Sequence, residues 1–343
     1  MKRHLNTLFV TTQGAYLSKD GETVAVKVED DIRLRTPVHT LGGIVCFGQV
    51  SCSPFLMGFC AEHGVSISFL TETGNFLAKV QGPVSGNVLL RREQYRQADD
   101  AKSSVEIAKA VLTGKIANCR AVLSRALRDH AEKIDFEAVS LAVNRLSGAL
   151  TKLHSESDIE VIRGIEGESA NIYFNVFDHL ITAQKDDFKF SVRNRRPPLD
   201  KVNCLLSFLY TIVMHDTRSA LETVGLDPAV GYLHRDRPGR YGLALDLMEE
   251  FRPVFADRVA LSLINLGQVQ GKGFDKKESG AVWMDDETRK AVLVTYQKRK
   301  QDEIIHPFLK EKVTIGLLFH TQALLFARHL RGDMDAYPPF IWK

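Results

Sequence analysis

Glu166 is a carboxylate at a position where a helix should be apolar. If residues 157–184 form a helix, the turn of 100° per residue brings Ile162 and Tyr173 within about 40° of Glu166, in the middle of an apolar stripe. An ionised carboxylate is too costly to bury alone, so this one must be paired, protonated or bound to a metal. Gly164 and Gly167 flank it, and each weakens a helix interior by roughly 1 kcal/mol relative to Ala. The glycines predict a close approach of backbone or ligand, and a structural salt bridge is the alternative reading of Glu166.

A second group of acids lies further along the chain. Asp246, Glu249 and Glu250 stand at positions i, i+3 and i+4, which a helix places on one face. Like charges on one face repel each other by roughly a few tenths of a kcal/mol per exposed pair, and a cation or a basic partner would relieve this repulsion. Glu249 could equally pair with Arg252, three residues on.

Two further polar features accompany these acids. His234 stands in an expected loop before the second acidic group, among arginines, where it is either a functional imidazole or plain polar surface. In the helix expected over 200–223, a polar row of Asn203, Ser207 and Tyr210 runs along an otherwise apolar segment. Such a row lines a site or forms a buried set of hydrogen bonds.

Together these residues suit one kind of chemistry. Carboxylate oxygens and a neutral imidazole are ligands for Mg²⁺ or Mn²⁺, and zinc is less favoured without thiolates or more histidines. Arginines near such a cation indicate a phosphate substrate. The cation would polarise a phosphodiester and activate a water or a 3′-hydroxyl for in-line attack.

The elements that must position these residues fall into two parts, and the fold class is α+β. Short alternating segments before residue 82 predict strands, with one short helix over 54–63, and indicate a β-rich, sandwich-like domain over 1–84. After a linker at 82–87, apolar residues recur every 3.6 positions and predict an all-α catalytic domain over 88–343. Irregular segments are expected at 185–198 and 271–280. The expected helices span 88–112, 116–130, 136–149, 157–184, 200–223, 243–256, 286–303 and 308–331.

Composition excludes several classes of protein. The 343 residues carry 45 Lys and Arg against 42 Asp and Glu, so the net charge is +3 and only local clusters could form a surface for a polyanion. No apolar run is long enough to span a membrane, and the N-terminal residues do not resemble a secretory signal, so we expect a cytoplasmic protein without a membrane partner. The five cysteines form no C-x-x-C pair, which favours reduced thiols over a metal site. The absence of phosphate-loop, dinucleotide-binding and nucleophile-elbow motifs removes support for nucleotide hydrolysis, nicotinamide redox chemistry and serine hydrolysis.

Four motifs in a fixed order carry a family resemblance. R-G-I-E-G, V-N-C-L-L-S-F-L-Y, G-Y-L-H-x-x-R-P-G-R and L-A-L-D-L-M-E-E-F-R-P together resemble the CRISPR-associated integrase and endonuclease family, the catalytic subunit of the spacer-acquisition complex. The resemblance spans essentially the whole chain. The length and the ending 337–343 look most like the type I-C branch.

The resemblance implies an N-terminal domain that dimerises and a helical domain that cuts and joins DNA. Family metal ligands match Glu166, His234 and Glu249, and some members have Asp at the last position. Asp246 matches an accessory acid, and Tyr210 and Asn203 match polar residues of the same pocket, so that Glu166, His234, Glu249, Asp246 and Tyr210 are the expected catalytic set. The expected cofactor is Mg²⁺ or Mn²⁺. Contacts to DNA are expected from Asn203 and from the basic residues near the motifs: Arg163, Arg193, Arg195, Arg196, Arg235, Arg237 and Arg240.

The implied reaction is transesterification, in which the 3′-hydroxyl of a short duplex attacks a phosphodiester of the repeat array. Expected partners are double-stranded and branched DNA, a second copy of the chain in a homodimer, and a small ferredoxin-like companion subunit. Two alternatives remain open at this point. One is a structure-selective, metal-dependent nuclease that acts on branched DNA in repair, and the other is a non-catalytic DNA-binding scaffold in which the acids form structural ion pairs.

Overall fold

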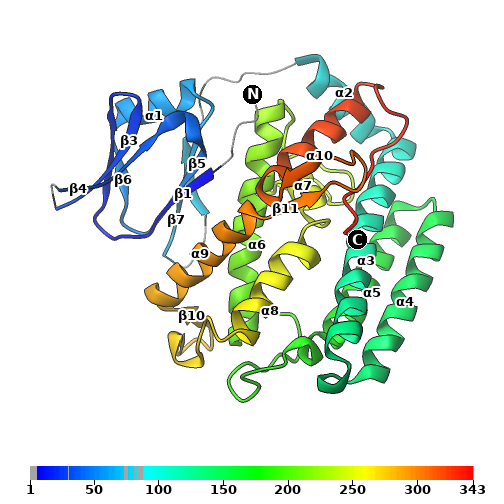
Figure 1. The fold of residues 1–343 in the computed structure, drawn as a ribbon. Coiled ribbons are helices and arrows are strands. Elements are labelled where there is room, and N and C mark those ends of the chain that lie inside the picture. The colour runs from blue at the N-terminus through cyan, green and yellow to red at the C-terminus, as the bar shows by residue number, and fades with distance from the viewer. Residues whose placement is uncertain (1–5, 30, 73–75, 81, 83–87, 343) are drawn as a thin grey trace.

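The computed structural model describes residues 6–29, 31–72, 76–80, 82 and 88–342. In these residues an N-terminal group of strands packs beside a mostly helical part, as expected (Figure 1). The linker expected at 82–87 falls largely outside the described residues. The strands of the N-terminal part are β1 (Asn6–Val10), β2 (Tyr16–Asp20), β3 (Thr23–Val28), β4 (Asp31–Pro37), β5 (Leu41–Phe47), β6 (Ser51–Cys52), β7 (Ser66–Leu70) and β8 (Phe76–Val80), with helix α1 (Pro54–Glu62) between β6 and β7.

The strands form two sheets, with the orders β1-β5-β7-β8 and β4-β3-β2-β6. The first sheet is mixed, because β5 pairs in parallel with both β1 and β7 while β8 is antiparallel to β7. Residues of both sheets and of α1, among them Leu17, Ile44 and Leu56, share one hydrophobic cluster.

The central strand β5 is buried on both faces. Ile44 and Cys46 point into the cluster of the N-terminal part, while Val45 and Phe47 join the core of the helical part. The ring of Phe47 lies 5.9 Å from that of Phe208, centroid to centroid. A strand covered on both faces reads as an unbroken apolar run, which is the pattern of residues 43–47.

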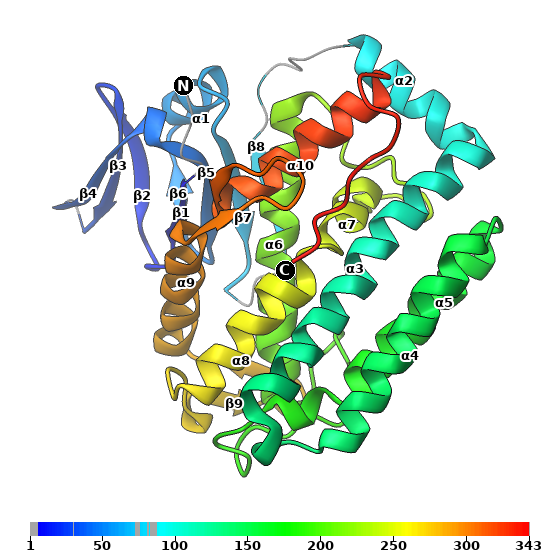
Figure 2. The same cartoon turned by 45° about the vertical axis from the view of Figure 1, so that its right-hand side comes forward.

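The helical part follows the strands in the sequence. The structure gives α2 (Val88–Asp99), α3 (Ala101–His130), α4 (Phe136–Ser155), α5 (Ile159–Asn175), α6 (Lys201–Val224), α7 (Gly242–Met248), α8 (Arg258–Asn265), α9 (Asp286–Gln301) and α10 (Ile315–Leu330). Helices α3, α4 and α5 run side by side, and α6 lies between them and the strands (Figures 1 and 2). Short hairpins β9 (Phe274–Lys276) with β10 (Val282–Met284), and β11 (Glu303–Ile305) with β12 (Lys312–Thr314), flank α9.

Helices α3, α4 and α6 each begin with an aspartate that caps the first turn. The side chains of Asp100, Asp135 and Asp200 accept hydrogen bonds from backbone N–H groups in the first turns of α3, α4 and α6, at 2.7, 2.9 and 2.7 Å. Each cap satisfies one of the N–H groups that the first helical turn leaves without a partner. The end of α6 is set by Gly225, which adopts φ 91°, a left-handed conformation that favours glycine.

Several expected boundaries are wrong. The expected break between 112 and 116 does not exist, because α3 continues through Gly114. The expected helix over 157–184 ends at Asn175 and is followed by a 3₁₀ turn, Phe177–Leu180. The expected helix over 243–256 is α7, then a π-helical turn, Arg252–Asp257, that leads into α8. The segment 271–280, expected to be irregular, contributes β9, and the helix expected from 308 begins at Ile315.

Polar contacts tie the two parts together at α6. Asp216 accepts hydrogen bonds from the hydroxyl groups of Thr7 on β1 and Tyr296 on α9, at 3.2 and 2.7 Å, and pairs with Lys300 at 2.8 Å. Lys79 on β8 forms an ion pair with Glu222. No helix within the described ranges has the length and apolar character that crossing a membrane requires.

Candidate active site

Glu166 and Glu249 converge on one ammonium group. Glu166 lies on α5, Glu249 follows α7, and Lys115 lies in the middle of α3. The Nζ of Lys115 contacts Oε1 of Glu166 and lies 2.9 Å from Oε2 of Glu249. Lys115 and Glu249 are buried, and the Glu166 side chain is 32% exposed. The structure therefore brings together two acids that lie far apart in the sequence.

Glu249 is held as an anion. Its Oε1 lies 2.6 Å from the guanidinium of Arg252, the i, i+3 pair that the sequence allowed. Burial alone would raise the pKa of Glu249, but Arg252, Lys115 and His234 outweigh it and lower that pKa to about 2. The same two carboxylates raise the pKa of Lys115 above its ordinary value, although burial acts in the opposite direction.

Asp246 orients the ring of His234. Asp246 is fully buried, and its Oδ1 lies 2.6 Å from Nδ1 of the imidazole. The same carboxylate accepts hydrogen bonds from the backbone N–H groups of Tyr232, Leu233 and His234, at 2.6, 3.1 and 3.0 Å. A carboxylate on one ring nitrogen fixes the ring and leaves the other nitrogen, Nε2, for a ligand.

Glycines allow this loop to pack against α7. An ideal Cβ on Gly231 would lie 2.7 Å from the carbonyl carbon of Gly242 and 2.9 Å from Oδ2 of Asp246. Both glycines are therefore needed where residues 231–234 cross the start of α7. Gly164 and Gly167 differ, because no described atom beyond α5's own backbone and the chain neighbours lies within 4 Å of a Cβ built on either. The expected close approach of backbone is not found at these two glycines, and the approach of a ligand there stays a prediction.

The sequence predicted that Asp246, Glu249 and Glu250 share one face of a helix. In the structure they do not. Helix α7 ends at Met248, and the acids point into three separate buried environments. Glu250 accepts hydrogen bonds from the hydroxyl of Tyr337 at 2.6 Å, the amide of Gln322 at 3.0 Å and the backbone N–H of Phe340 at 2.7 Å. Burial raises the pKa of Glu250 to about 8 despite these donors.

Tyr210 is positioned by a buried acid that the sequence did not single out. Its hydroxyl donates a hydrogen bond to Oδ1 of Asp257 at 2.7 Å. Burial raises the pKa of Asp257 to about 6, although the Tyr210 hydroxyl opposes the rise. The guanidinium groups of Arg193 and Arg252 lie over the Tyr210 ring, at 5.2 and 4.8 Å from its centroid.

Asn203 is fully buried, so the expected direct contact with DNA needs correction. Its Oδ1 accepts hydrogen bonds from Arg193 and from the backbone N–H of Asn194, and its Nδ2 donates to Val192 and Asp200. The amide is thus used inside the chain. Asn203 holds the loop that carries Arg193, Arg195 and Arg196.

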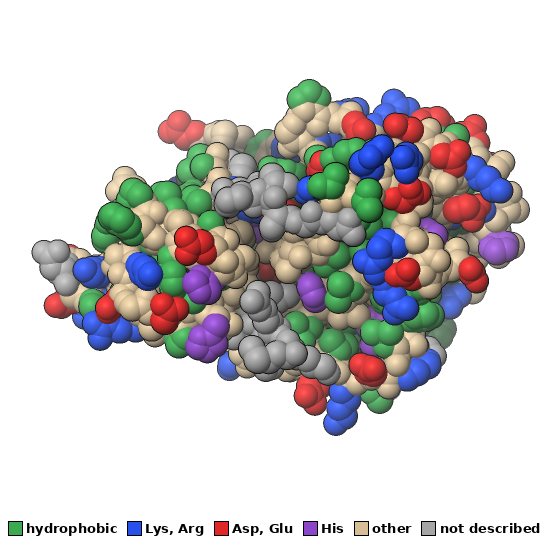
Figure 3. All heavy atoms as spheres, turned by 90° about the horizontal axis from the view of Figure 1, so that it is seen from above, with side chains coloured by type: hydrophobic (Ala, Val, Ile, Leu, Met, Phe, Trp, Pro, Cys, Tyr) green, Lys and Arg blue, Asp and Glu red, His purple; other side chains and the backbone are tan. Residues whose placement is uncertain are grey.

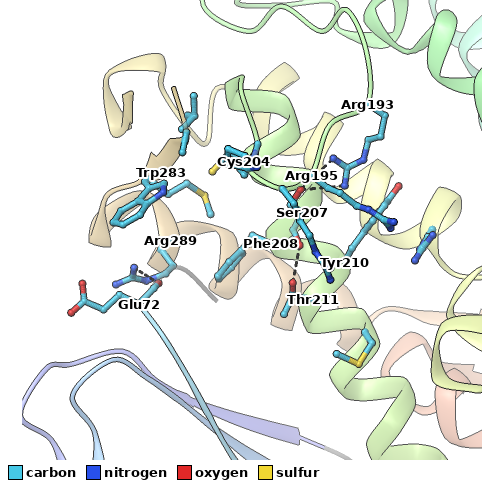
Figure 4. Close-up of a pocket in the computed structure, with 18 of the residues that line it drawn as sticks. Glu72, Arg193, Arg195, Cys204, Ser207, Phe208, Tyr210, Thr211, Trp283 and Arg289 are labelled. Carbon is cyan, nitrogen blue, oxygen red and sulfur yellow. Dashed lines mark hydrogen bonds between the residues drawn. The ribbon is translucent and has the colours of Figure 1, made fainter. Parts of the chain in front are cut away.

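Two cavities meet at this arginine loop. The larger, about 610 Å³, lies between α6, β10, α9 and the loop, with Arg195 and Tyr210 on one side and Trp283 and Arg289 on the other (Figure 4). The smaller, about 190 Å³, is lined by Lys115 and Glu166. The side chains that line both cavities are Arg193, Arg195, Tyr210 and Arg252.

The expected DNA-contacting arginines gather from three segments. Burial and the neighbouring charges of Arg237, Arg195 and Arg163 lower the pKa of Arg240, so these groups lie near one another. Arg163 donates a hydrogen bond to the carbonyl of Leu233 at 2.7 Å and also pairs with Glu160, as does Arg235. By contrast, basic and acidic side chains are interspersed over the helical part in the view from above (Figure 3).

The side chains of Glu166, Glu249 and His234 are of the kinds that bind a hard divalent cation, but they are not grouped closely enough to bind one together. Two carboxylates reach one point, and an imidazole with a fixed ring lies close enough to Glu249 to influence its pKa. Oxygen donors with one imidazole suit Mg²⁺ or Mn²⁺. Within the part of the chain that the structure describes, however, no three His, Cys, Asp or Glu side chains are already grouped as metal ligands.

Lys115 and Asp257 are the site residues that sequence reasoning missed. Lys115 had a usable signal, because Val111, Leu112 and Cys119 surround it at helical spacing, as apolar residues surround Glu166. The expected helix break at 113–115 concealed that pattern. Asp257 gave no such signal, because it ends a π-helical turn whose period differs from that of an α-helix.

Comparison with known proteins agrees with the order of the motifs. A family model described as CRISPR associated protein Cas1 matches residues 8–298. A relative named CRISPR-associated endonuclease Cas1 1, from Chlorobaculum tepidum, is 58% identical over 343 residues and is covered completely, as is this chain.

Solved structures share the fold at lower identity. A casposase bound to integration product superposes with a TM-score of 0.84 at 22% identity, covering 99% of this chain and 95% of that one. A Cas6-RT-Cas1–Cas2 complex matches with a TM-score of 0.83 at 23% identity, over 100% of this chain and 36% of that one. At these identities the likeness is one of fold.

Proposed function

This chain belongs to the CRISPR-associated protein Cas1 family, and on that premise we propose that it is a metal-dependent DNA endonuclease and integrase. It inserts short DNA duplexes into a CRISPR array by transesterification, in adaptive antiviral defence. The name of the Chlorobaculum tepidum relative supports the nuclease activity, and the casposase bound to integration product supports the joining reaction. The observation that carries the proposal is the convergence of Glu166 and Glu249 on one point, with the oriented ring of His234 close enough to Glu249 to influence its pKa.

Glu166, His234 and Glu249 would hold Mg²⁺ or Mn²⁺. When bound, the cation supplies a Lewis acid that polarises the phosphodiester and offsets the charge that develops on it. Glu249 is ionised at neutral pH, as a ligand must be. Asp246 holds Nδ1 of His234 and so directs Nε2 away from itself.

The arginines would hold the phosphates. Arg240 lies near Arg163, Arg195 and Arg237, while Arg193, Arg195 and Arg196 line the larger cavity. Arg235 lies beside Arg163, since both pair with Glu160. Tyr210 separates the two cavities and is kept in place by Asp257. Because transesterification exchanges one phosphodiester for another, the reaction needs no phosphate loop for ATP.

The proposal includes the assembly. Double-stranded and branched DNA are the substrates, the strands over 1–84 form the interface of a homodimer, and a small ferredoxin-like subunit bridges two such dimers. The fold shared with a Cas6-RT-Cas1–Cas2 complex supports a companion of the Cas2 kind. The ending 337–343 supports the type I-C branch, and the proposed action on cellular DNA supports a cytoplasmic location.

The test replaces Glu166 and keeps a matched control on the same helix. Glu166→Ala should abolish strand transfer of a duplex with a free 3′-hydroxyl, while DNA affinity stays within about twofold, because a ligand of the cation is lost and the arginines remain. Glu168→Ala, whose side chain is exposed and 3.6 Å from Arg145, should keep full activity. Full strand transfer by Glu166→Ala in saturating Mn²⁺ would reject the assignment.

The same assay separates the alternatives. A repair nuclease would cleave branched DNA but leave the supplied 3′-hydroxyl unjoined. The scaffold alternative is favoured by one observation, namely that Glu166 and Glu249 already have basic partners. A scaffold would show no Mn²⁺ binding in calorimetry that depends on Glu166.

A further inference from the structure

Lys115 occupies the point at which the two candidate ligands meet. Its ammonium contacts Oε1 of Glu166 and lies 2.9 Å from Oε2 of Glu249. The other oxygen of Glu249 lies 2.6 Å from Arg252. Two carboxylates and two cations therefore balance, and the ammonium is the cation shared by both acids.

A divalent cation bound to the same two oxygens cannot coexist with this arrangement. Ligand oxygens lie about 2.0–2.2 Å from Mg²⁺ or Mn²⁺-sized cations, so the cation would replace the ammonium between them. An ammonium left in contact would repel the cation across a few ångströms, where charges interact strongly.

The structure supplies a route for the exchange. The cavity of about 190 Å³ borders both Lys115 and Glu166. Glu249 would keep Arg252 as a partner after the ammonium leaves. Glu166, one-third exposed, would receive the incoming cation.

We propose that Lys115 is a positioning residue that competes with the divalent cation for Glu166 and Glu249, and that metal binding moves its ammonium into the adjacent cavity. The competition keeps the two acids at one point while it lowers their affinity for metal. This inference rests on the proposed metal site but goes beyond it, because it assigns Lys115 as the residue that sets the metal affinity.

The first test measures Mn²⁺ binding by calorimetry. Lys115→Met should bind Mn²⁺ at least about tenfold more tightly than the unmodified chain, because a competing charge is removed. Lys115→Arg keeps the charge and should remain near the original affinity. Lys300→Met is the matched control, since Lys300 is equally buried and pairs with Asp216 at 2.8 Å, away from the site.

The second measurement follows heat stability with and without Mn²⁺. Without metal, both Lys115→Met and Lys300→Met should unfold at lower temperature, because each leaves a buried carboxylate short of a partner. Added Mn²⁺ should raise the unfolding temperature of Lys115→Met more than that of the original chain, and that of Lys300→Met by the same amount as the original. Equal Mn²⁺ shifts in all three proteins would show a purely structural ion pair.

A third measurement needs no variant, and so remains decisive if Lys115→Met fails to fold. Acetylation of Lys115 by an amine-reactive ester, followed by mass spectrometry, should accelerate when Mn²⁺ is added, while acetylation of Lys300 should not change. Unchanged labelling of Lys115, or unchanged or weaker Mn²⁺ binding by Lys115→Met, would overturn the competition. If Glu166→Ala still removes Mn²⁺ binding, only this inference fails, whereas Mn²⁺ binding that is absent or independent of Glu166 overturns the proposed metal site as well.

Discussion

Glu166 and Lys115, which form an ion pair, are both charged side chains in an otherwise apolar stripe of a helix. Glu166 was found from the sequence in this way, and Lys115 carries the same signal on α3. What the sequence could not supply was the partner, because pairing depends on how α3 and α5 pack. The sequence left two alternatives for Glu166, an ion pair or a bound metal. In the proposed competition Glu166 has both, because Lys115 pairs with it until the cation binds.

At the same scale, Asp257 should make stability depend on pH. Its pKa rises from an ordinary 3.8 to about 6 in the folded chain, so between these values the folded state binds more protons than the unfolded state. The contribution is complete below pH 4 and is lost as pH rises through 6. Relative to Asp257→Asn, the free energy of unfolding of the original chain should fall by at most ~3 kcal/mol across this window.

Urea unfolding of both proteins at several pH values measures this difference. Asn at 257 can still accept the hydrogen bond from Tyr210, and other titrating groups are common to both proteins. Parallel pH profiles for the two proteins would contradict the raised pKa of Asp257.

At the scale of the element, periodicity predicted most strands and helices but not where helices continue or stop. The break expected between 112 and 116 does not exist, and Gly114 lies inside α3, where a Cβ would lie 3.0 Å from Cγ of Glu250 and from Cβ of Pro339. The glycine is needed for packing, which depends on residues far away in the sequence.

Helix α3 also fastens the segment 337–342. Asn118, one turn after Lys115, donates hydrogen bonds to the carbonyls of Glu250 and Phe340, at 2.7 and 2.8 Å, and accepts one from the N–H of Trp342 at 2.7 Å. Asn118→Ala should therefore lower the free energy of unfolding by about 2–4 kcal/mol, because buried backbone groups lose their partners. It should also free the segment for digestion by a carboxypeptidase, followed by mass spectrometry.

The control for this prediction is Asn144→Ala, at an exposed position of α4. Digestion of residues 337–342 at the same rate in Asn118→Ala, Asn144→Ala and the original chain would show that Asn118 does not hold the segment.

At the scale of the whole molecule, the two-part organisation was visible in the change of period, but the packing between the parts was not. Nothing in the sequence pairs Phe47 of β5 with Phe208 of α6, or Asp216 with both β1 and α9. The gathering of arginines was inferred only from closeness to the motifs. Their convergence depends on the loop that Asn203 holds and on the crossing of Gly231 over Gly242.

This convergence predicts how DNA binding responds to salt. Arg240→Ala should reduce the magnitude of the slope of log affinity against log salt by about 0.9, the value for one phosphate contact on duplex DNA. Arg33→Ala, at an exposed position of β4, should leave the slope unchanged. Fluorescence anisotropy with a labelled duplex at several salt concentrations measures both, and equal slopes for Arg240→Ala and the original chain would remove Arg240 from the DNA surface.

The hydrogen bonds that the Glu250 carboxylate accepts from Tyr337 and Phe340 have a consequence for synthesis of the chain. The turn at 249–251 obtains donors from Tyr337 and Phe340, so it lacks those partners while these residues are still inside the ribosome. Residues 337–342 must emerge before the carboxylate beside that turn takes its final place.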